Sequence, residues 1–146
     1  MLLKKVLKWF FIVFFILIAF LLYNSIYFDI PRDELEAKYA KPPSDFIILD
    51  DGSRIHYRDE GNPNGPTIFL LHGFTSSLFS FEKLTPLINQ EYRIISFDFP
   101  GFGLTGAVPN RDYSFEALLK TVNKMKNKLE VDKFTILGHS MGGRVA

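Results

Sequence analysis

The sequence predicts an α/β domain that follows a single transmembrane helix. Three short apolar runs, 68–71, 94–97 and 134–137, show no alternation of polar and apolar positions. Such runs are typical of strands that are buried on both faces of a parallel sheet. Stretches with helical character separate the three runs, and this order favours right-handed crossovers within one sheet. A long apolar stretch near the N-terminus predicts the transmembrane helix.

The composition of the 146 residues indicates a folded domain that does not bind nucleic acid. Hydrophobic residues make up 47% and charged residues 23% of the chain, which excludes intrinsic disorder. The formal net charge is +1, from 17 basic and 16 acidic residues, whereas nucleic-acid-binding domains concentrate a basic excess. The absence of cysteine excludes thiol catalysis, cysteine-ligated metals and disulfides.

Residues 1–28 are predicted to form an N-terminal membrane anchor with a basic flank. The segment 9–28 is apolar except for Asn24 and Ser25. As a helix it would span roughly 30 Å, which is the thickness of the hydrocarbon core of a bilayer. Three lysines precede this segment, namely Lys4, Lys5 and Lys8. They favour a cytoplasmic N-terminus, so we expect the rest of the chain to lie outside the cytoplasm.

A cleaved signal peptide is the main alternative for this segment, because it too begins with lysines and continues with apolar residues. Signal peptides end with small residues one and three positions before the cut, and residues 20–26 contain no such pair. A buried core helix, the third alternative, would need a larger fold around it. We therefore expect an uncleaved anchor that interacts with the lipid bilayer.

Residues 29–44 separate the anchor from the folded domain and are predicted to be a linker. They are charged and bounded by Pro31 and Pro43, and the acidic residues that begin at Asp33 favour a short helix. The α/β domain then occupies residues 45–146.

The domain is predicted to open with an antiparallel hairpin at the edge of the sheet. Residues 46–49 and 54–58 are the two strands, and the polar residues 50–53 form the turn. In the second strand polar and apolar residues alternate, which suits an edge strand with one solvated face. We expect His56 to lie on that solvated face.

Two helices are predicted between the parallel strands. The first covers residues 78–89. The second begins after Ser114, whose hydroxyl suits an N-cap. Its predicted apolar face consists of Phe115, Leu118, Leu119, Val122, Met125 and Leu129, and its solvated face carries Lys120, Lys124, Lys126 and Lys128.

The segment Gly138-His-Ser-Met-Gly-Gly143 follows the last strand and fits the pattern G-x-S-x-G. This nucleophile elbow is a tight strand-to-helix turn that raises a serine hydroxyl above the edge of the sheet. Because glycine tolerates close backbone approach, Gly138 and Gly142 allow the turn. The segment therefore predicts Ser140 as a nucleophile.

Two further loops end the earlier parallel strands. His72-Gly73-Phe74 follows the first of them, where an acyl-transfer enzyme needs a backbone donor for the oxyanion. The loop 98–103, with sequence Asp-Phe-Pro-Gly-Phe-Gly, follows the second. It is not expected to be a phosphate-binding P-loop, because it lacks the lysine of that motif.

With these three motifs in this order, the chain resembles the serine branch of the α/β-hydrolase fold family over residues 46–146, the N-terminal half of such a domain. The resemblance implies that Ser140 is the nucleophile and that the backbone N–H groups of Phe74 and Met141 form the oxyanion hole. It implies a small-molecule acyl substrate and neither metal nor organic cofactor. A serine at the elbow argues against the haloalkane dehalogenase and epoxide hydrolase branches, which use aspartate there.

The triad of this family continues from serine to an acid and then to histidine. Only six residues follow Ser140, and none of them is Asp, Glu or His. We expect the domain to be cut after the elbow and this portion alone to be inactive. Three earlier histidines are not expected to replace the base, since His72 shapes a loop, His139 packs and His56 is solvated.

Three functions fit this sequence. The leading prediction is a membrane-anchored serine hydrolase that forms an acyl-enzyme with a carboxylic ester or a similar acyl substrate. A carbon–carbon bond hydrolase of the same fold is the alternative within enzymes. From another class, a non-catalytic anchored binding module would keep the pocket without the chemistry.

Overall fold

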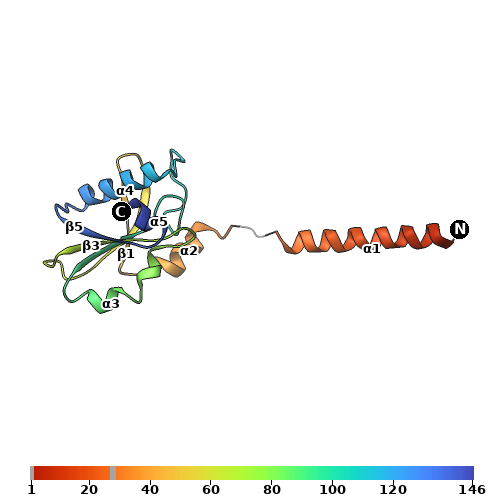
Figure 1. Cartoon of the computed structure of the whole chain (residues 1–146), viewed down its shortest axis with the longest axis horizontal. Coiled ribbons are helices and arrows are strands. Elements are labelled where there is room, and N and C mark those ends of the chain that lie inside the picture. The colour runs from red at the N-terminus through yellow and green to blue at the C-terminus, as the bar shows by residue number, and fades with distance from the viewer. Residues whose placement is uncertain (1, 27–28) are drawn as a thin grey trace. The chain divides into compact units, whose positions relative to one another are not determined.

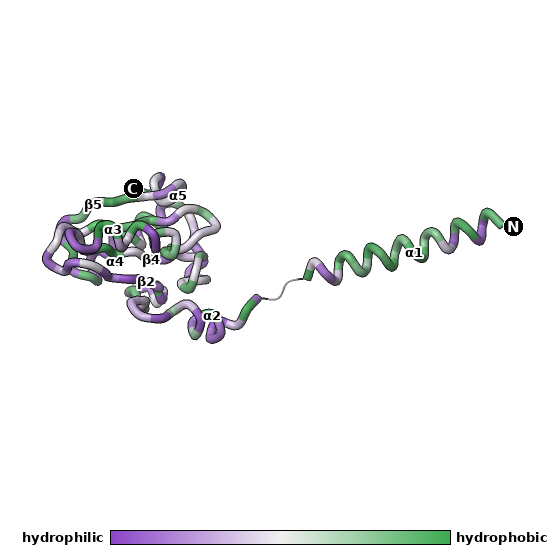
Figure 2. The backbone as a smooth tube through the Cα atoms, turned by 90° about the horizontal axis from the view of Figure 1, so that it is seen from below, coloured by the Kyte–Doolittle hydropathy of each residue, from purple (hydrophilic) through white to green (hydrophobic). Residues whose placement is uncertain are grey.

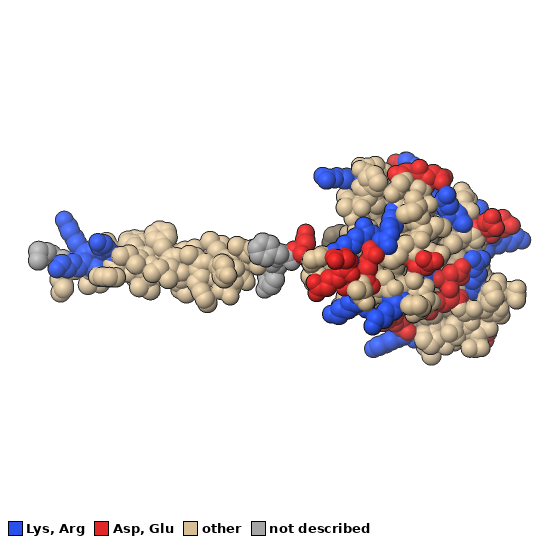
Figure 3. Space-filling view, turned by 180° about the vertical axis from the view of Figure 1, so that it is seen from behind, with Lys and Arg blue, Asp and Glu red and all other residues tan. Residues whose placement is uncertain are grey.

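The computed structural model describes residues 2–26 and 29–146. The described residues divide into two compact units, with the boundary between Pro31 and Arg32. The first unit contains α1 (Leu2–Asn24), a helix of 23 residues with no buried side chain and a mean hydropathy of 2.6 over its most apolar window. Figure 2 shows this apolar character along the helix, and Figure 3 shows basic side chains gathered at its N-terminal end. The last two residues of the predicted anchor, 27–28, lie outside the described residues.

The second unit is built on one five-stranded sheet with the order β1-β2-β4-β3-β5. Its strands are β1 (Ser44–Ile48), β2 (Arg54–Gly61), β3 (Thr67–Leu71), β4 (Arg93–Phe97) and β5 (Phe134–Gly138). The pairs β1–β2 and β2–β4 are antiparallel, whereas β3 is parallel to both β4 and β5. The predicted hairpin followed by parallel strands is therefore confirmed.

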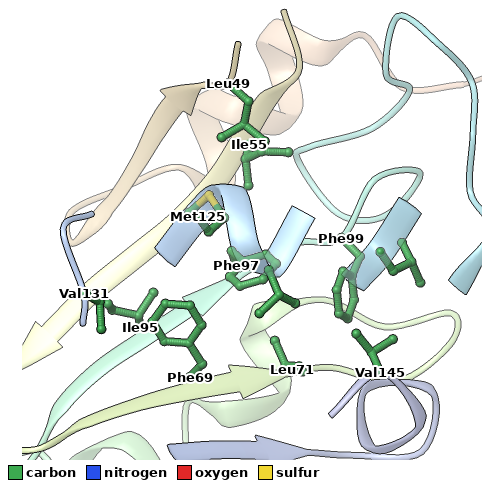
Figure 4. Close-up of a cluster of buried hydrophobic side chains, with 12 residues drawn as sticks. Leu49, Ile55, Phe69, Leu71, Ile95, Phe97, Phe99, Met125, Val131 and Val145 are labelled. Carbon is green, nitrogen blue, oxygen red and sulfur yellow. The ribbon is translucent and has the colours of Figure 1, made fainter. Parts of the chain in front are cut away.

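Helices cover both faces of the sheet (Figure 1). On one face, α4 (Phe115–Lys128) and α5 (Met141–Val145) enclose the larger hydrophobic core, which Figure 4 shows around Phe69, Phe97 and Met125. On the other face, a smaller cluster of Leu70, Phe81 and Ile94 lies beneath the 3₁₀ turn η1 (Leu78–Phe81) and the helix α3 (Thr85–Ile88). Because successive residues of a strand point to opposite faces, the apolar runs supply both cores.

The prediction of one continuous helix over residues 78–89 is wrong, because η1 and α3 are two separate short helices. Pro86 occupies the first turn of α3. Proline has no backbone N–H, and its ring collides with the carbonyl of the preceding turn, so it starts a helix and does not continue one.

The second predicted helix is confirmed as α4, and the Ser114 hydroxyl accepts a hydrogen bond from the Ala117 N–H at 3.2 Å. Its predicted apolar face is only partly buried. Leu118, Val122 and Met125 are in the core, whereas Phe115 and Leu119 remain 40% and 46% exposed.

The segment predicted as a linker contains α2 (Arg32–Tyr39), which contacts the domain through its polar side chains. Glu36 accepts two hydrogen bonds from the guanidinium of Arg54, at 2.6 and 3.0 Å. Arg32 donates to the backbone carbonyl of Leu104 at 3.1 Å. Hydrogen bonds from Arg54 lower the pKa of Glu36 below its usual value, although burial opposes this shift. This helix belongs to the same compact unit as the sheet.

Candidate active site

The carboxyl ends of the three parallel strands meet at one edge of the sheet. The register places Leu71 of β3 beside Phe97 of β4 and beside Gly138 of β5. The loops that begin at His72, at Asp98 and at His139 therefore leave the sheet side by side. Open α/β sheets bind their ligands at this edge.

Ser140 occupies a tight turn between β5 and α5, in the strand–turn–helix context that the G-x-S-x-G pattern requires. Its backbone has φ 52° and ψ −112°, a left-handed conformation that costs a non-glycine residue about 1–3 kcal/mol. A Cβ at Gly142 would overlap the carbonyl of Leu71, and one at Gly138 would overlap the backbone of Gly142. The two glycines therefore let the turn pack closely on β3, and Ser140 itself stays exposed.

The loop after β3 passes directly beside this turn. A Cβ added to Gly73 would lie 3.3 Å from the Cβ of Ser140 and 2.9 Å from the Nδ1 atom of His139. The next residue, Phe74, is 69% exposed and lines the same cavity as Ser140 and Met141. The structure thus brings together all three residues that the sequence assigns to the nucleophile and the oxyanion hole.

The cavity at Ser140 has a volume of about 560 Å³ and is mainly apolar. Its wall is formed by Phe74, Phe102, Tyr113, Phe115, Leu118, Ser140, Met141 and Arg144. Phe102 lies in the loop 98–103, but Tyr113, Phe115 and Arg144 were not predicted to be at the site. One signal was available, because Arg144 follows Ser140 by four residues and so shares its helix face.

His72 shapes the loops at this edge, as predicted. Its side chain is fully buried, with Nδ1 2.7 Å from the carbonyl oxygen of Gly73 and Nε2 accepting from the Phe99 N–H at 3.0 Å. Burial lowers the pKa of His72 below its usual value. A neutral imidazole with both nitrogen atoms engaged suits a structural role.

The prediction that His56 is solvated is wrong. β2 is not an edge strand, because β4 pairs with its other side, and η1 covers the face that carries His56. His56 and Asp98 are both 0% exposed, and the His56 Nδ1 atom lies 2.8 Å from the Asp98 carboxylate. That carboxylate also accepts from the backbone N–H groups of Leu78 and Leu104, which agrees with the predicted loop-bonding role of Asp98.

The expected packing of His139 is also not found, since its side chain is exposed beside Gly73. Among the described residues, no group of three or more His, Asp or Glu side chains is arranged to hold a metal ion. Within the same residues, no histidine paired with a carboxylate is placed beside Ser140, because the buried pair of His56 and Asp98 lies under η1.

Comparison with known proteins assigns the family. The profile of the alpha/beta hydrolase fold matches residues 66–146. The chain is 38% identical to the uncharacterized hydrolase YugF of Bacillus subtilis over 96 residues, which cover 66% of this chain and 35% of that protein. It is 33% identical to bifunctional epoxide hydrolase 2 of Sus scrofa over 100 residues, 67% of this chain and 18% of that protein.

Solved structures agree with this assignment. The esterase EaEST of Exiguobacterium antarcticum superposes with a TM-score of 0.62 at 31% identity, over 68% of this chain and 37% of the esterase. The chain thus spans about a third of the length of YugF and of this esterase. The sheet order, the elbow between β5 and α5 and these similarities lead to one conclusion: the chain belongs to the α/β hydrolase fold family.

Proposed function

We propose that the protein is a membrane-anchored serine hydrolase that acts on a carboxylic ester or a similar acyl substrate. The observation that carries the proposal is the position of Ser140, on a strained turn at the carboxyl edge of the sheet and open to an apolar cavity. A strained, exposed serine at this place serves no packing purpose, and strain of this kind concentrates at functional sites.

In the proposed reaction, the Ser140 hydroxyl oxygen attacks the acyl carbonyl and its proton passes to a base. The backbone N–H groups of Phe74 and Met141 stabilise the oxyanion that develops in the tetrahedral intermediate. The intermediate then expels the alcohol, which takes up the proton, and leaves an acyl group on Ser140. Water attacks this acyl-enzyme with the help of the same base, releases the acid and restores the serine.

The base and its acid partner are proposed to come from the remainder of the full-length protein, which follows the family order of serine, acid and histidine. Two described histidines are engaged elsewhere: His56 binds Asp98, and both nitrogen atoms of His72 have backbone partners. A carbon–carbon bond hydrolase would use the same serine, so a panel of ester and diketone substrates distinguishes the two enzymes.

The first experiment replaces Ser140 with alanine in the full-length protein. We expect kcat for 4-nitrophenyl butyrate to fall by about 10⁶, as it does when a triad serine is removed, and labelling by a fluorophosphonate to disappear. Ser80→Ala is the control, since Ser80 is an exposed serine in η1 on the other side of the sheet. Ordinary turnover by Ser140→Ala would refute the assignment, and an inactive, unlabelled wild-type protein would favour the binding module.

Membrane anchoring is the second part of the proposal. α1 is about 35 Å long at 1.5 Å per residue, which is sufficient to cross the hydrocarbon core. The lysines in its first turns, before the apolar run, favour a cytoplasmic N-terminus. Protease added to intact spheroplasts should therefore digest the chain after Pro31. Full protection would contradict the orientation, and a mature protein that begins between residues 20 and 40 would show that the segment is cleaved.

A further inference from the structure

Arg144 lies one helical turn after Ser140, and both side chains line the same cavity. The Arg144 N–H donates to the Ser140 carbonyl oxygen at 3.2 Å, which is the hydrogen bond of an α-helical turn. Residues four positions apart lie on the same face of a helix. A group bound at Ser140 is therefore within reach of the Arg144 guanidinium.

The guanidinium of Arg144 is held at the cavity wall by an aromatic ring. Its Cζ atom lies 4.0 Å from the centroid of the Phe115 ring, a distance typical of a cation–π contact. Phe115 is itself fixed at the first turn of α4, directly after the N-cap Ser114. Arg144 is exposed to solvent, but the contact with the ring restricts its side chain and keeps the cation beside the cavity.

No carboxylate among residues 2–26 and 29–146 pairs with Arg144. The nearby Glu116 is bound to Lys120 at 2.9 Å, and the other ion pairs of the described chain lie elsewhere in the domain. The rest of the wall is aromatic or aliphatic apart from Ser140 and the tyrosine hydroxyl. An anion that bound between this exposed guanidinium and the apolar wall would be partly shielded from water, and charges attract each other more strongly where water is excluded.

We propose that the substrate carries a carboxylate on its acyl part and that Arg144 binds this group. The inference rests on the proposed serine hydrolase function and specifies its substrate class. The apolar cavity wall would contact the methylene chain, while the guanidinium would donate two parallel N–H bonds to the carboxylate. Arg144 then selects half-esters of dicarboxylic acids over neutral esters of the same length.

The test uses two substrates with the same six-carbon acyl chain, mono-4-nitrophenyl adipate and 4-nitrophenyl hexanoate. The measured quantity is the ratio of kcat/KM for the adipate to kcat/KM for the hexanoate in the full-length protein. We expect the wild type to favour the adipate at low salt and this preference to weaken as salt is added. Arg144→Gln should lower the ratio about 10- to 100-fold, the range expected for a lost charge-assisted hydrogen bond.

Three further variants separate the effect of the Arg144 charge from the effects of side-chain length and of the net charge of the protein. Arg144→Met removes the charge but keeps a long side chain against Phe115, so it should lower the ratio as Arg144→Gln does. Arg144→Lys keeps the charge and should retain part of the preference. Lys133→Gln makes the same change in charge at an exposed residue before the start of β5, at the opposite end of that strand, and should leave the ratio unchanged.

These measurements distinguish a wrong carboxylate assignment from a wrong hydrolase assignment. If hydrolysis depends on Ser140 but the ratio is the same in wild type, Arg144→Gln and Arg144→Met, the carboxylate assignment is wrong and the serine hydrolase stands. An equal fall in the ratio for Lys133→Gln would likewise overturn it, because the effect would then be one of net charge. If neither ester is hydrolysed in a Ser140-dependent way, the proposed function itself fails.

Discussion

The buried carboxylate of Asp98 joins three parts of the chain, and its replacement by alanine tests this packing directly. Three donors point at it, namely the N–H of Leu78 at 2.7 Å, the N–H of Leu104 at 2.8 Å and the His56 imidazole at 2.8 Å. Asp98 and His56 are both fully buried. Asp98→Ala therefore leaves three buried donors without an acceptor.

The expected loss of stability follows from these contacts. An orphaned buried donor costs about 1–3 kcal/mol, so three such donors would together cost about 3–9 kcal/mol. Because the small alanine leaves space for water to bind some of the donors, we expect Asp98→Ala to lower the free energy of unfolding by about 3–5 kcal/mol. That is a large part of the roughly 5–15 kcal/mol that stabilises a typical domain.

The assay is urea-induced unfolding of the full-length protein, followed by circular dichroism. Asp132→Ala is the matched control, because Asp132 is exposed in the turn before β5, and its effect should stay within about 0.5 kcal/mol. A loss below about 1 kcal/mol for Asp98→Ala would show that the buried network does not stabilise the fold as inferred.

Two further predictions concern the elbow and the surface. Gly142→Ala should destabilise the protein by about 1–3 kcal/mol or more and reduce fluorophosphonate labelling, because its Cβ would overlap the Leu71 carbonyl. Asp51 should stabilise the fold by at most about 1 kcal/mol, since its pair with Lys124 is partly exposed. Burial raises the pKa of Asp51, but hydrogen bonds from Lys124 and Ser53 lower it to about 2 from 3.8. This contribution is therefore complete above about pH 4 and is lost as the pH falls towards 2.

Each of these predictions has a control. Gly143→Ala, whose Cβ would lie 3.2 Å from the Gly138 carbonyl oxygen, should change stability by less than about 1 kcal/mol. The difference in stability between the wild type and Asp51→Asn should vanish near pH 2. A difference that stays constant from pH 6 to pH 2 would contradict the lowered pKa.

Several features were predictable because they depend on neighbours in the sequence. The uninterrupted apolar runs became β3, β4 and β5. β3 and β4 are covered on both faces, as such runs predict. The prediction is wrong for β5, which lies at the edge of this sheet and has Thr135 and Leu137 exposed on one face. Ser114 caps α4 through a hydrogen bond within one helical turn. The glycines around Ser140 allow a turn that few other residues tolerate. Even the break between η1 and α3 had a local signal in Pro86.

What only the tertiary structure decided depends on segments that are distant in the sequence. His56 is buried because η1 packs on the face of β2 that carries it. β2 is also an inner strand, since β4 follows β3 in the chain but inserts between β3 and β2. The cavity wall combines Phe74, Phe102, Phe115 and Arg144 from four separate segments. Local pattern assigns a residue to a helix face or a strand face, but burial and pairing depend on which elements pack against that face. The sequence by itself therefore determined the fold class and the strand–turn–helix context of Ser140. The buried pair of His56 and Asp98 and the place of Arg144 beside Ser140 depend on the packing of distant segments.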